Sequence, residues 1–184
     1  MEKNEIRQLI KEKRTKMSKT EVLEKSRIIH QKLLTIEEFL SATTVMVYLS
    51  AFNEVDTTEI VQVLLTSAKR VVIPVSDTST ETIIPSYITS MDELQKGAFG
   101  ILEPISIRKA QIADIDSLLV PGIAFDMQRN RMGFGKGYYD KLLCLSDAAK
   151  IGLCYDFQLQ KNISTEEHDI PMDLIVTEER ILRG

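Results

Sequence analysis

Short apolar runs rich in β-branched residues recur along this chain and alternate with segments of helical periodicity. The runs have the length of buried strands and are too short for buried helices. They cover residues 45–50, 71–75, 83–89, 118–121, 151–155 and 174–177. Near-continuous apolar strands separated by helices are typical of a parallel sheet covered on both faces. The sequence therefore predicts an α/β fold, a three-layer α/β/α domain with a mostly parallel central sheet.

Helical segments are expected at residues 2–17, 18–34, 37–40, 56–68 and 138–145, with one further short helix at 90–93. Ser18 and Glu21 have the spacing of a capping box, which marks the start of the second helix. The apolar side chains expected to face inward from that helix are Val22, Leu23, Ile29, Leu33 and Leu34. In the first helix, the apolar stripe predicts that the basic residues lie off the buried face.

The length of 184 residues predicts one domain, spanning 1–184. The net charge is −4, which argues against a protein that coats nucleic acid, and no nucleic-acid partner is expected. The charge is uneven, because residues 1–19 carry seven basic and three acidic side chains. The N-terminal segment is therefore the one basic feature of an otherwise acidic chain.

The two cysteines, Cys144 and Cys154, are too few for a disulfide framework and lack the spacing of a zinc site. The longest apolar stretch, residues 118–125, is interrupted by Pro121 and Gly122. It is far shorter than the roughly 18 residues of a membrane span, so no membrane partner is expected. No secretory segment follows the basic N-terminus, and the expected compartment is the cytoplasm.

Residues 131–140 hold three glycines at alternate positions, Gly133, Gly135 and Gly137. Glycine permits positive φ angles, and the backbone N–H groups of such a loop can turn inward to bind an anion. The loop is expected to lead into a helix N-terminus, which also favours phosphate. Arg131 and Lys136 add positive charge, so the segment predicts a phosphate site.

Asp140 follows the same loop and offers a hard oxygen ligand for Mg²⁺ beside the phosphates. A Walker A loop is excluded, because it needs a longer gap between its glycines and Ser or Thr after the lysine. A dinucleotide-binding fingerprint is excluded by the spacing of the glycines. The alternative is a flexible turn between a strand and a helix.

Residues 118–126 (Leu-Leu-Val-Pro-Gly-Ile-Ala-Phe-Asp) together with 131–140 (Arg-Met-Gly-Phe-Gly-Lys-Gly-Tyr-Tyr-Asp) resemble the signature of the 5-formyltetrahydrofolate cyclo-ligase family. The resemblance covers the whole chain. Weaker matches occur, in order, at Lys3 and Arg7, at 54–57, at 99–104, at His168 and Asp169, and at 171–173. Their order and spacing make the match specific.

The resemblance implies an ATP- and Mg²⁺-dependent ring closure of 5-formyltetrahydrofolate to 5,10-methenyltetrahydrofolate, with release of ADP and phosphate. A formamide oxygen is a poor leaving group, and phosphorylation turns it into one. Phosphoryl transfer depends mostly on positioning and charge neutralisation. The resemblance thus implies catalytic roles for Lys136 and Arg131.

The resemblance also implies the remaining site residues. Contacts with ATP are implied for Lys3, Asn4, Glu5, Ile6, Arg7, Arg131, Met132, Gly133, Phe134, Gly135, Lys136, Gly137, Tyr138 and Tyr139. Contacts with the reduced folate are implied for Leu49, Glu54, Phe134, Gly135, Lys136, Gly137 and Tyr138. Asp140 and Asp173 are implied as Mg²⁺ ligands, and the family suggests a monomer.

Two other functions share these features. A small-molecule kinase would use ATP and Mg²⁺ but leave the phosphate on its product. A non-catalytic folate- or nucleotide-binding module would not need Arg131, Lys136 and Asp140 together. The glutamate content of the folate tail, the pairing of side chains with individual phosphates and the role of His168 stay open at this point.

Overall fold

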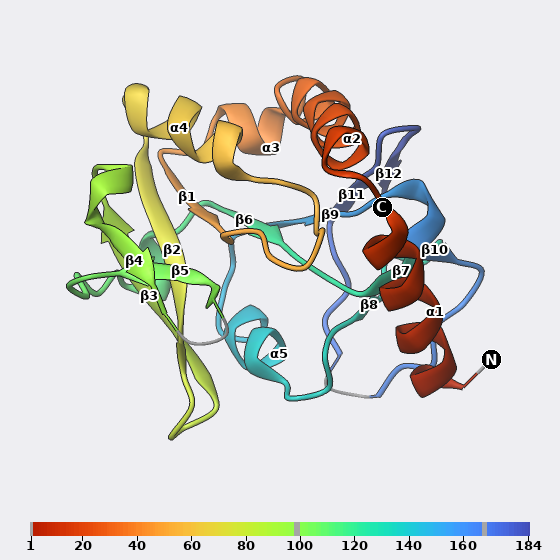
Figure 1. Cartoon of the computed structure of the whole chain (residues 1–184). Helices are drawn as coiled ribbons and strands as arrows, with labels where there is room; N and C mark the ends of the chain where they lie inside the picture. Colours follow the sequence, from red (N-terminus) through yellow and green to blue (C-terminus); the bar gives the residue numbers. More distant parts are fainter. Residues whose placement is uncertain (1, 98–99, 167–168) are drawn as a thin grey trace.

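The computed structural model describes residues 2–97, 100–166 and 169–184, and a seven-stranded sheet lies at its centre (Figure 1). The strand order is β12-β11-β9-β6-β1-β2-β3. The strands are β1 (Thr44–Val47), β2 (Arg70–Asp77), β3 (Thr82–Ile88), β6 (Ser117–Val120), β9 (Ala149–Leu153), β11 (Leu174–Val176) and β12 (Ile181–Arg183). The five inner strands run parallel, and the edge strands β3 and β12 pair antiparallel. The predicted mostly parallel sheet is confirmed.

The helices are α1 (Lys3–Lys16), α2 (Lys19–Leu33), α3 (Glu37–Leu40), α4 (Thr58–Thr66) and α5 (Tyr138–Leu143). α2, α3 and α4 cover one face of the sheet, and α5 covers the other (Figure 1). Ile29 of α2 and Val61 of α4 share a core with Val47 of β1, whereas Leu142 of α5 packs with Leu118 of β6. The predicted three layers are therefore present, and the second helical layer is one short helix.

Every residue of β1 and β6 is buried, because helices cover both faces of these central strands. This explains why their sequences do not alternate between apolar and polar residues: after Thr44 and Ser117, the remaining three residues of each strand are apolar. Pro85 is tolerated in β3 because that strand lies at the edge of the sheet.

The helix starting at Ser18 begins as predicted, because the Ser18 hydroxyl accepts a hydrogen bond from the Glu21 backbone N–H at 3.1 Å. Two inward positions are wrong: Leu23 and Leu34 are 42% and 44% exposed. The side chains of α2 that are buried include Ser26 and His30 instead. Ser26 satisfies its hydroxyl by accepting a hydrogen bond from the Asp56 backbone N–H at 2.8 Å.

Two small sheets flank the central one and were not predicted. The three-stranded sheet contains β10 (Leu159–Gln160), β7 (Ala124–Asp126) and β8 (Arg131–Met132), and the two-stranded sheet contains β4 (Leu94–Lys96) and β5 (Leu102–Pro104). Strands of two or three residues are too short to show a periodic pattern. α1 packs on the three-stranded sheet through Ile6 and Ile10, which contact Ala124 and Met132 in a third core.

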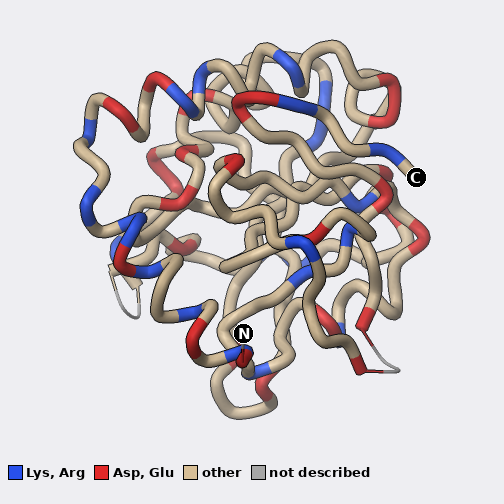
Figure 2. Tube along the Cα trace, turned by 90° about the vertical axis from the view of Figure 1, so that its right-hand side faces the viewer, with Lys and Arg blue, Asp and Glu red and all other residues tan. Residues whose placement is uncertain are grey.

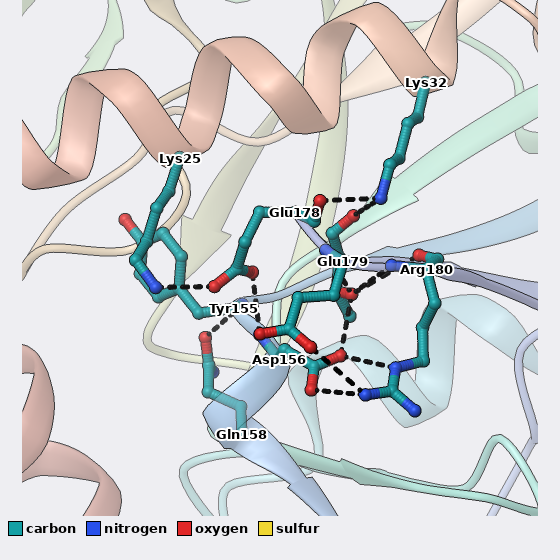
Figure 3. Close-up of polar contacts among 9 residues, drawn as sticks. Lys25, Lys32, Tyr155, Asp156, Gln158, Glu178, Glu179 and Arg180 are labelled. Carbon is teal, nitrogen blue, oxygen red and sulfur yellow. Dashed lines mark hydrogen bonds and ion pairs between the residues drawn. The ribbon is translucent and has the colours of Figure 1, made fainter.

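A polar network fixes the turn between β11 and β12 to α2 (Figure 3). Lys25 of α2 forms an ion pair with Glu178 at 2.6 Å, and Lys32 donates to the Thr177 and Glu178 carbonyls. Arg180 binds both oxygens of Asp156, at 2.8 and 2.9 Å. The network therefore holds the segment after β9, in which Tyr155 and the 3₁₀ turn η4 (Asp156–Gln158) lie.

Figure 2 shows that basic and acidic residues are interspersed along the traced chain. Of the helices in the described part of the chain, none has the length and apolar character needed to cross a bilayer.

His30 generates a prediction about the pH dependence of stability. Burial lowers the pKa of this imidazole below its ordinary value of 6.5, against the weaker opposing effects of Asp56 and Glu59. The unfolded chain therefore binds a proton at His30 more readily than the folded chain, and the free energy of unfolding falls as the pH drops below about 6.5. Replacement by leucine removes this contribution.

We expect wild-type protein to lose about 1 kcal/mol more unfolding free energy than His30→Leu between about pH 7.5 and about pH 5.5. Urea unfolding at both pH values measures the difference. His168→Gln is the matched control, because His168 is the other histidine of the chain. Equal pH slopes for wild type and His30→Leu would contradict the prediction.

Candidate functional site

A cavity of about 510 Å³ opens at the carboxyl ends of the parallel strands. Tyr48 and Leu49, which follow β1, line it together with Pro121 and Gly122, which follow β6. Ligands of open parallel sheets bind at this edge. The remaining walls come from α1, from the glycine-rich loop, from the β2–β3 hairpin, from residues 101–103 and from a later segment. That later segment contributes Ile163, Ser164, Glu166 and Asp169. Segments far apart in the sequence therefore meet at one pocket, called the strand-end pocket below.

The glycine-rich loop connects β8 to α5 and contributes every residue from Arg131 to Asp140 to the pocket lining. Gly135 and Gly137 have φ angles of 94° and 69°, which side-chain-bearing residues adopt at a cost. Gly137 is also the N-cap of α5. Because α5 has only six residues, its dipole adds little, and the loop amides and nearby charges are the relevant anion-binding groups.

Arg131 is nearly buried and is held in place by three contacts. Its Nη2 lies 2.7 Å from Asp140 Oδ1, and its Nη1 donates to the Pro121 carbonyl at 3.4 Å. Its guanidinium lies over the Tyr139 ring, 5.5 Å from the centroid. Arg131 therefore presents a fixed positive charge in the pocket wall.

Lys136 is exposed at the tip of the loop and lines the pocket. In the described part of the chain, its ammonium makes no hydrogen bond or ion pair. It is a flexible charge that is free to approach a ligand, in contrast to Arg131.

α1 supplies two further cations to the pocket wall. Arg7 donates from Nε to the Gly133 carbonyl at 3.2 Å, which fixes the loop, and Lys3 lies 3.4 Å from Glu166 Oε1. The structure does not bring Asn4, Glu5 or Ile6 to the pocket lining.

Those three residues serve α1 itself. Asn4 Oδ1 accepts a hydrogen bond from Arg7, Glu5 accepts one from the Glu2 backbone N–H, and Ile6 is buried. Of the residues expected to contact ATP in this segment, only Lys3 and Arg7 line the pocket, and these two share one face of the helix.

Glu54 lies on the wall that follows β1, and only 11% of its side chain is exposed. Its Oε2 accepts a hydrogen bond from the Ala51 backbone N–H at 3.0 Å. Burial raises the pKa of this carboxyl, whereas Arg14 and the Ala51 N–H act in the opposite direction.

Burial also raises the pKa of Tyr48 and of Tyr139, and the nearby Glu54 charge contributes to both shifts. Both phenols are therefore neutral donors beside the carboxylate.

The structure does not bring Asp173 to the pocket. This residue precedes β11, and its Oδ2 accepts a hydrogen bond from the Lys150 backbone N–H at 2.7 Å. It therefore lies at the amino ends of the parallel strands, at the edge opposite the pocket. The structure therefore does not bring Asp140 and Asp173 together, although both were expected around one metal ion.

Asp169 lines the pocket instead, as Asp140 and Glu166 do. Asp169 Oδ2 accepts a hydrogen bond from the Glu166 backbone N–H at 2.8 Å, which fixes the orientation of the carboxylate. Within the described residues no cluster of three or more metal-ligating side chains forms. His168 and Phe99, which belong to segments matched to the family in the sequence, lie outside the described residues.

Sequence reasoning missed Arg14 and Tyr155. The basic residues of the first helix were expected off its apolar face, but Arg14 is only 4% exposed. Arg14 follows Ile6 and Ile10 at intervals of four residues. This spacing puts it on the same helix face as the two isoleucines and could have predicted its burial. Tyr155 donates from its hydroxyl to the Glu54 carbonyl at 2.9 Å, a contact between residues 101 positions apart that no local pattern reveals.

Comparison with known proteins adds to this geometry. The model of the 5-formyltetrahydrofolate cyclo-ligase family matches residues 1–178. A Caenorhabditis elegans protein named probable 5-formyltetrahydrofolate cyclo-ligase is 30% identical, with alignment over 96% of this chain and 92% of the relative.

Two solved structures are similar over nearly their whole lengths. The Aquifex aeolicus 5,10-methenyltetrahydrofolate synthetase has a TM-score of 0.88 and 34% identity, with coverage of 100% of this chain and 93% of the other. The Mycoplasma pneumoniae 5,10-methenyltetrahydrofolate synthetase has a TM-score of 0.79 and 27% identity, with coverage of 97% and 99%. Since the family model and these relatives extend along almost the whole sequence, this chain belongs to the 5-formyltetrahydrofolate cyclo-ligase family and is a ligase of folate metabolism.

Proposed function

We propose that this chain converts 5-formyltetrahydrofolate to 5,10-methenyltetrahydrofolate in an ATP-dependent reaction in the strand-end pocket. The observation that carries the proposal is the composition of the pocket walls. A glycine-rich loop with Lys136 and Arg131 faces the same cavity as the buried Glu54 carboxylate. One wall suits a polyphosphate, and the other suits the ring donors of a reduced pterin.

The γ-phosphoryl group of ATP is transferred to the formyl oxygen, and ADP leaves. N10 of the folate then attacks the activated formyl carbon and loses its proton to solvent, and the C–O bond breaks with release of phosphate. Lys136 is free to follow the transferred group, whereas Arg131 and Arg7 are fixed charges that orient the nucleotide. Preorganised charges of this kind lower the barrier of phosphoryl transfer.

Glu54 binds the pterin through its amino and ring N–H donors. Its Oε1 accepts no hydrogen bond within the described residues, so this oxygen is available to a ligand. Leu49 and Tyr138 line the same cavity and supply apolar surface, and Phe134, which is 64% exposed, covers its rim. The folate and nucleotide sites share residues 134–138, which places the formyl oxygen beside the γ-phosphate.

Asp140 and Asp169 are the carboxylates suited to Mg²⁺, because both line the pocket beside the phosphate-binding loop. One or two carboxylates together with substrate phosphates are the usual Mg²⁺ complement. When bound, the ion neutralises phosphate charge. Arg131 holds the Asp140 carboxylate and the Glu166 N–H holds that of Asp169, so both are oriented by this chain's own contacts.

The deciding experiment mixes the purified chain with MgATP and 5-formyltetrahydrofolate and follows methenyl absorbance together with phosphate release. Both signals are expected in equal amounts and only with ATP. ATP consumption that yields a phosphorylated product without the chromophore would identify a kinase. Folded protein that binds ligands without turnover would identify a binding module.

Lys136→Ala removes the one mobile cation of the loop and should lower kcat by on the order of 100-fold. Lys161→Ala is the matched control, since it removes the same charge from an exposed lysine outside the pocket. Steady-state turnover of both variants measures the effect. Wild-type turnover in Lys136→Ala would remove this lysine from the mechanism.

The metal assignment predicts different outcomes for three aspartates. Asp140→Asn and Asp169→Asn should each raise the Mg²⁺ concentration for half-maximal rate by about 10-fold or more. Asp173→Asn should leave it unchanged, because the side chain lies at the opposite edge of the sheet. A shift in Asp173→Asn without one in Asp169→Asn would restore the pairing expected from the sequence.

A further inference from the structure

Arg14 is a buried arginine that faces the back of the Glu54 wall. It extends from α1 to the turn that follows β1, where its Nε and Nη2 donate to the Phe52 carbonyl at 3.0 and 2.6 Å. Nη2 also donates to the Ala51 carbonyl at 3.2 Å. The guanidinium thus closes the turn from outside the pocket, and Arg14 is not among the residues that line the cavity.

The turn adopts a backbone conformation that needs such support. Phe52 and Asn53 have φ angles of 52° and 54°, and a bulky residue such as phenylalanine rarely occupies this left-handed region. Asn53 also connects the turn to the end of α1, because its Nδ2 donates to the Arg14 and Met17 carbonyls at 2.7 and 3.3 Å. Left-handed residues persist where the surrounding structure imposes them, and here α1 does so.

The same guanidinium acts on the Glu54 carboxylate. Arg14 Nη2 lies 3.8 Å from Glu54 Oε1, which is too long for a hydrogen bond but close enough for a strong charge interaction at a buried site. Tyr155 ties the Glu54 carbonyl from the opposite side at 2.9 Å, and the Ala51 N–H binds Oε2 at 3.0 Å. Arg14 therefore offsets part of the cost of burying the Glu54 charge, and Oε1 accepts no hydrogen bond from the described residues, so it has lone pairs available to a ligand.

We propose that Arg14 is a positioning residue for folate recognition, which holds the turn 51–54 and keeps the Glu54 carboxylate ready to accept the pterin donors. This role rests on the proposed function. Burial alone raises the pKa of Glu54, and Arg14 works against that rise. A lysine ammonium can also bind two carbonyls, as Lys32 does, but its donors rotate about one nitrogen. The planar guanidinium of Arg14 instead holds Nε and Nη2 in a fixed geometry on the turn while Nη2 faces the carboxylate.

A double-mutant cycle tests the proposal on the full chain. KM values for 5-formyltetrahydrofolate and for MgATP are measured for wild type, Arg14→Met, Glu54→Gln and the double variant. Arg14→Met should raise the folate KM by about 10-fold or more and change the ATP KM by less than about 3-fold. In the Glu54→Gln background, Arg14→Met should change the folate KM by less than about 3-fold, because its partner is already neutral.

Lys13→Met is the matched control, since it removes one charge from the neighbouring, exposed position of α1. Thermal unfolding of each variant separates local from global effects. If Arg14→Met does not fold, Arg14→Lys takes its place in the cycle. It should raise the folate KM in the wild-type background and change it by less than about 3-fold in the Glu54→Gln background.

The outcomes distinguish failure of the positioning role of Arg14 from failure of the proposed function. Equal effects of the Arg14 change in both backgrounds, or a parallel rise of folate and ATP KM, would overturn the positioning role while the wild-type enzyme stays active. A wild-type chain that neither turns over nor binds 5-formyltetrahydrofolate in calorimetry would reject the proposed function, and with it the role of Arg14.

Discussion

The parallel pairing of β1 with both β2 and β6 decides where the functional segments of this chain lie. Parallel strands need a crossover between them, so the chain returns each time to the same starting edge. All of the segments that follow the inner strands then emerge at the other edge, and the Glu54 turn and the Pro121 segment come together there. The pocket depends on this shared direction more than on any single side chain.

The two walls of the pocket, one formed by the glycine-rich loop and one by Glu54, are stabilised in different ways. The wall formed by the glycine-rich loop is rich in backbone groups, with Gly135 and Gly137 at positive φ and Arg7 bound to the Gly133 carbonyl. The Glu54 wall is a buried carboxylate supported by Arg14 and Tyr155. A buried carboxylate without a cation nearby would favour its protonated form, which cannot accept hydrogen bonds with both oxygens equally. The second wall therefore needs partners from distant elements, whereas the first is almost local.

This difference explains how far the sequence could predict the site. The loop 131–140 is contiguous, so its glycines and charges are visible in one segment, and the strands and helices follow from periodicity. Asp173 was misplaced, because a residue next to a strand can lie at either edge of the sheet and the motif does not say which. Tyr155 contacts Glu54 across 101 positions of the sequence, and Asp169 lines the pocket although its own hydrogen bond, with Glu166, is local. No spacing rule connects either residue to Glu54 or Asp140. Arg14 was visible as a charge on an apolar stripe, but its burial required the turn that it binds.

The contact between Lys3 and Glu166 joins residues 163 positions apart. During synthesis from the N-terminus, the α1 wall of the pocket is therefore made well before the wall that contains Ile163, Ser164, Glu166 and Asp169. The β11–β12 turn, whose Glu178 accepts a hydrogen bond from the Asp156 backbone N–H beside Tyr155, follows later still. A chain that extends past the glycine-rich loop but not past these segments lacks part of the pocket lining, so a ligand of this pocket stabilises only molecules in which both walls are present.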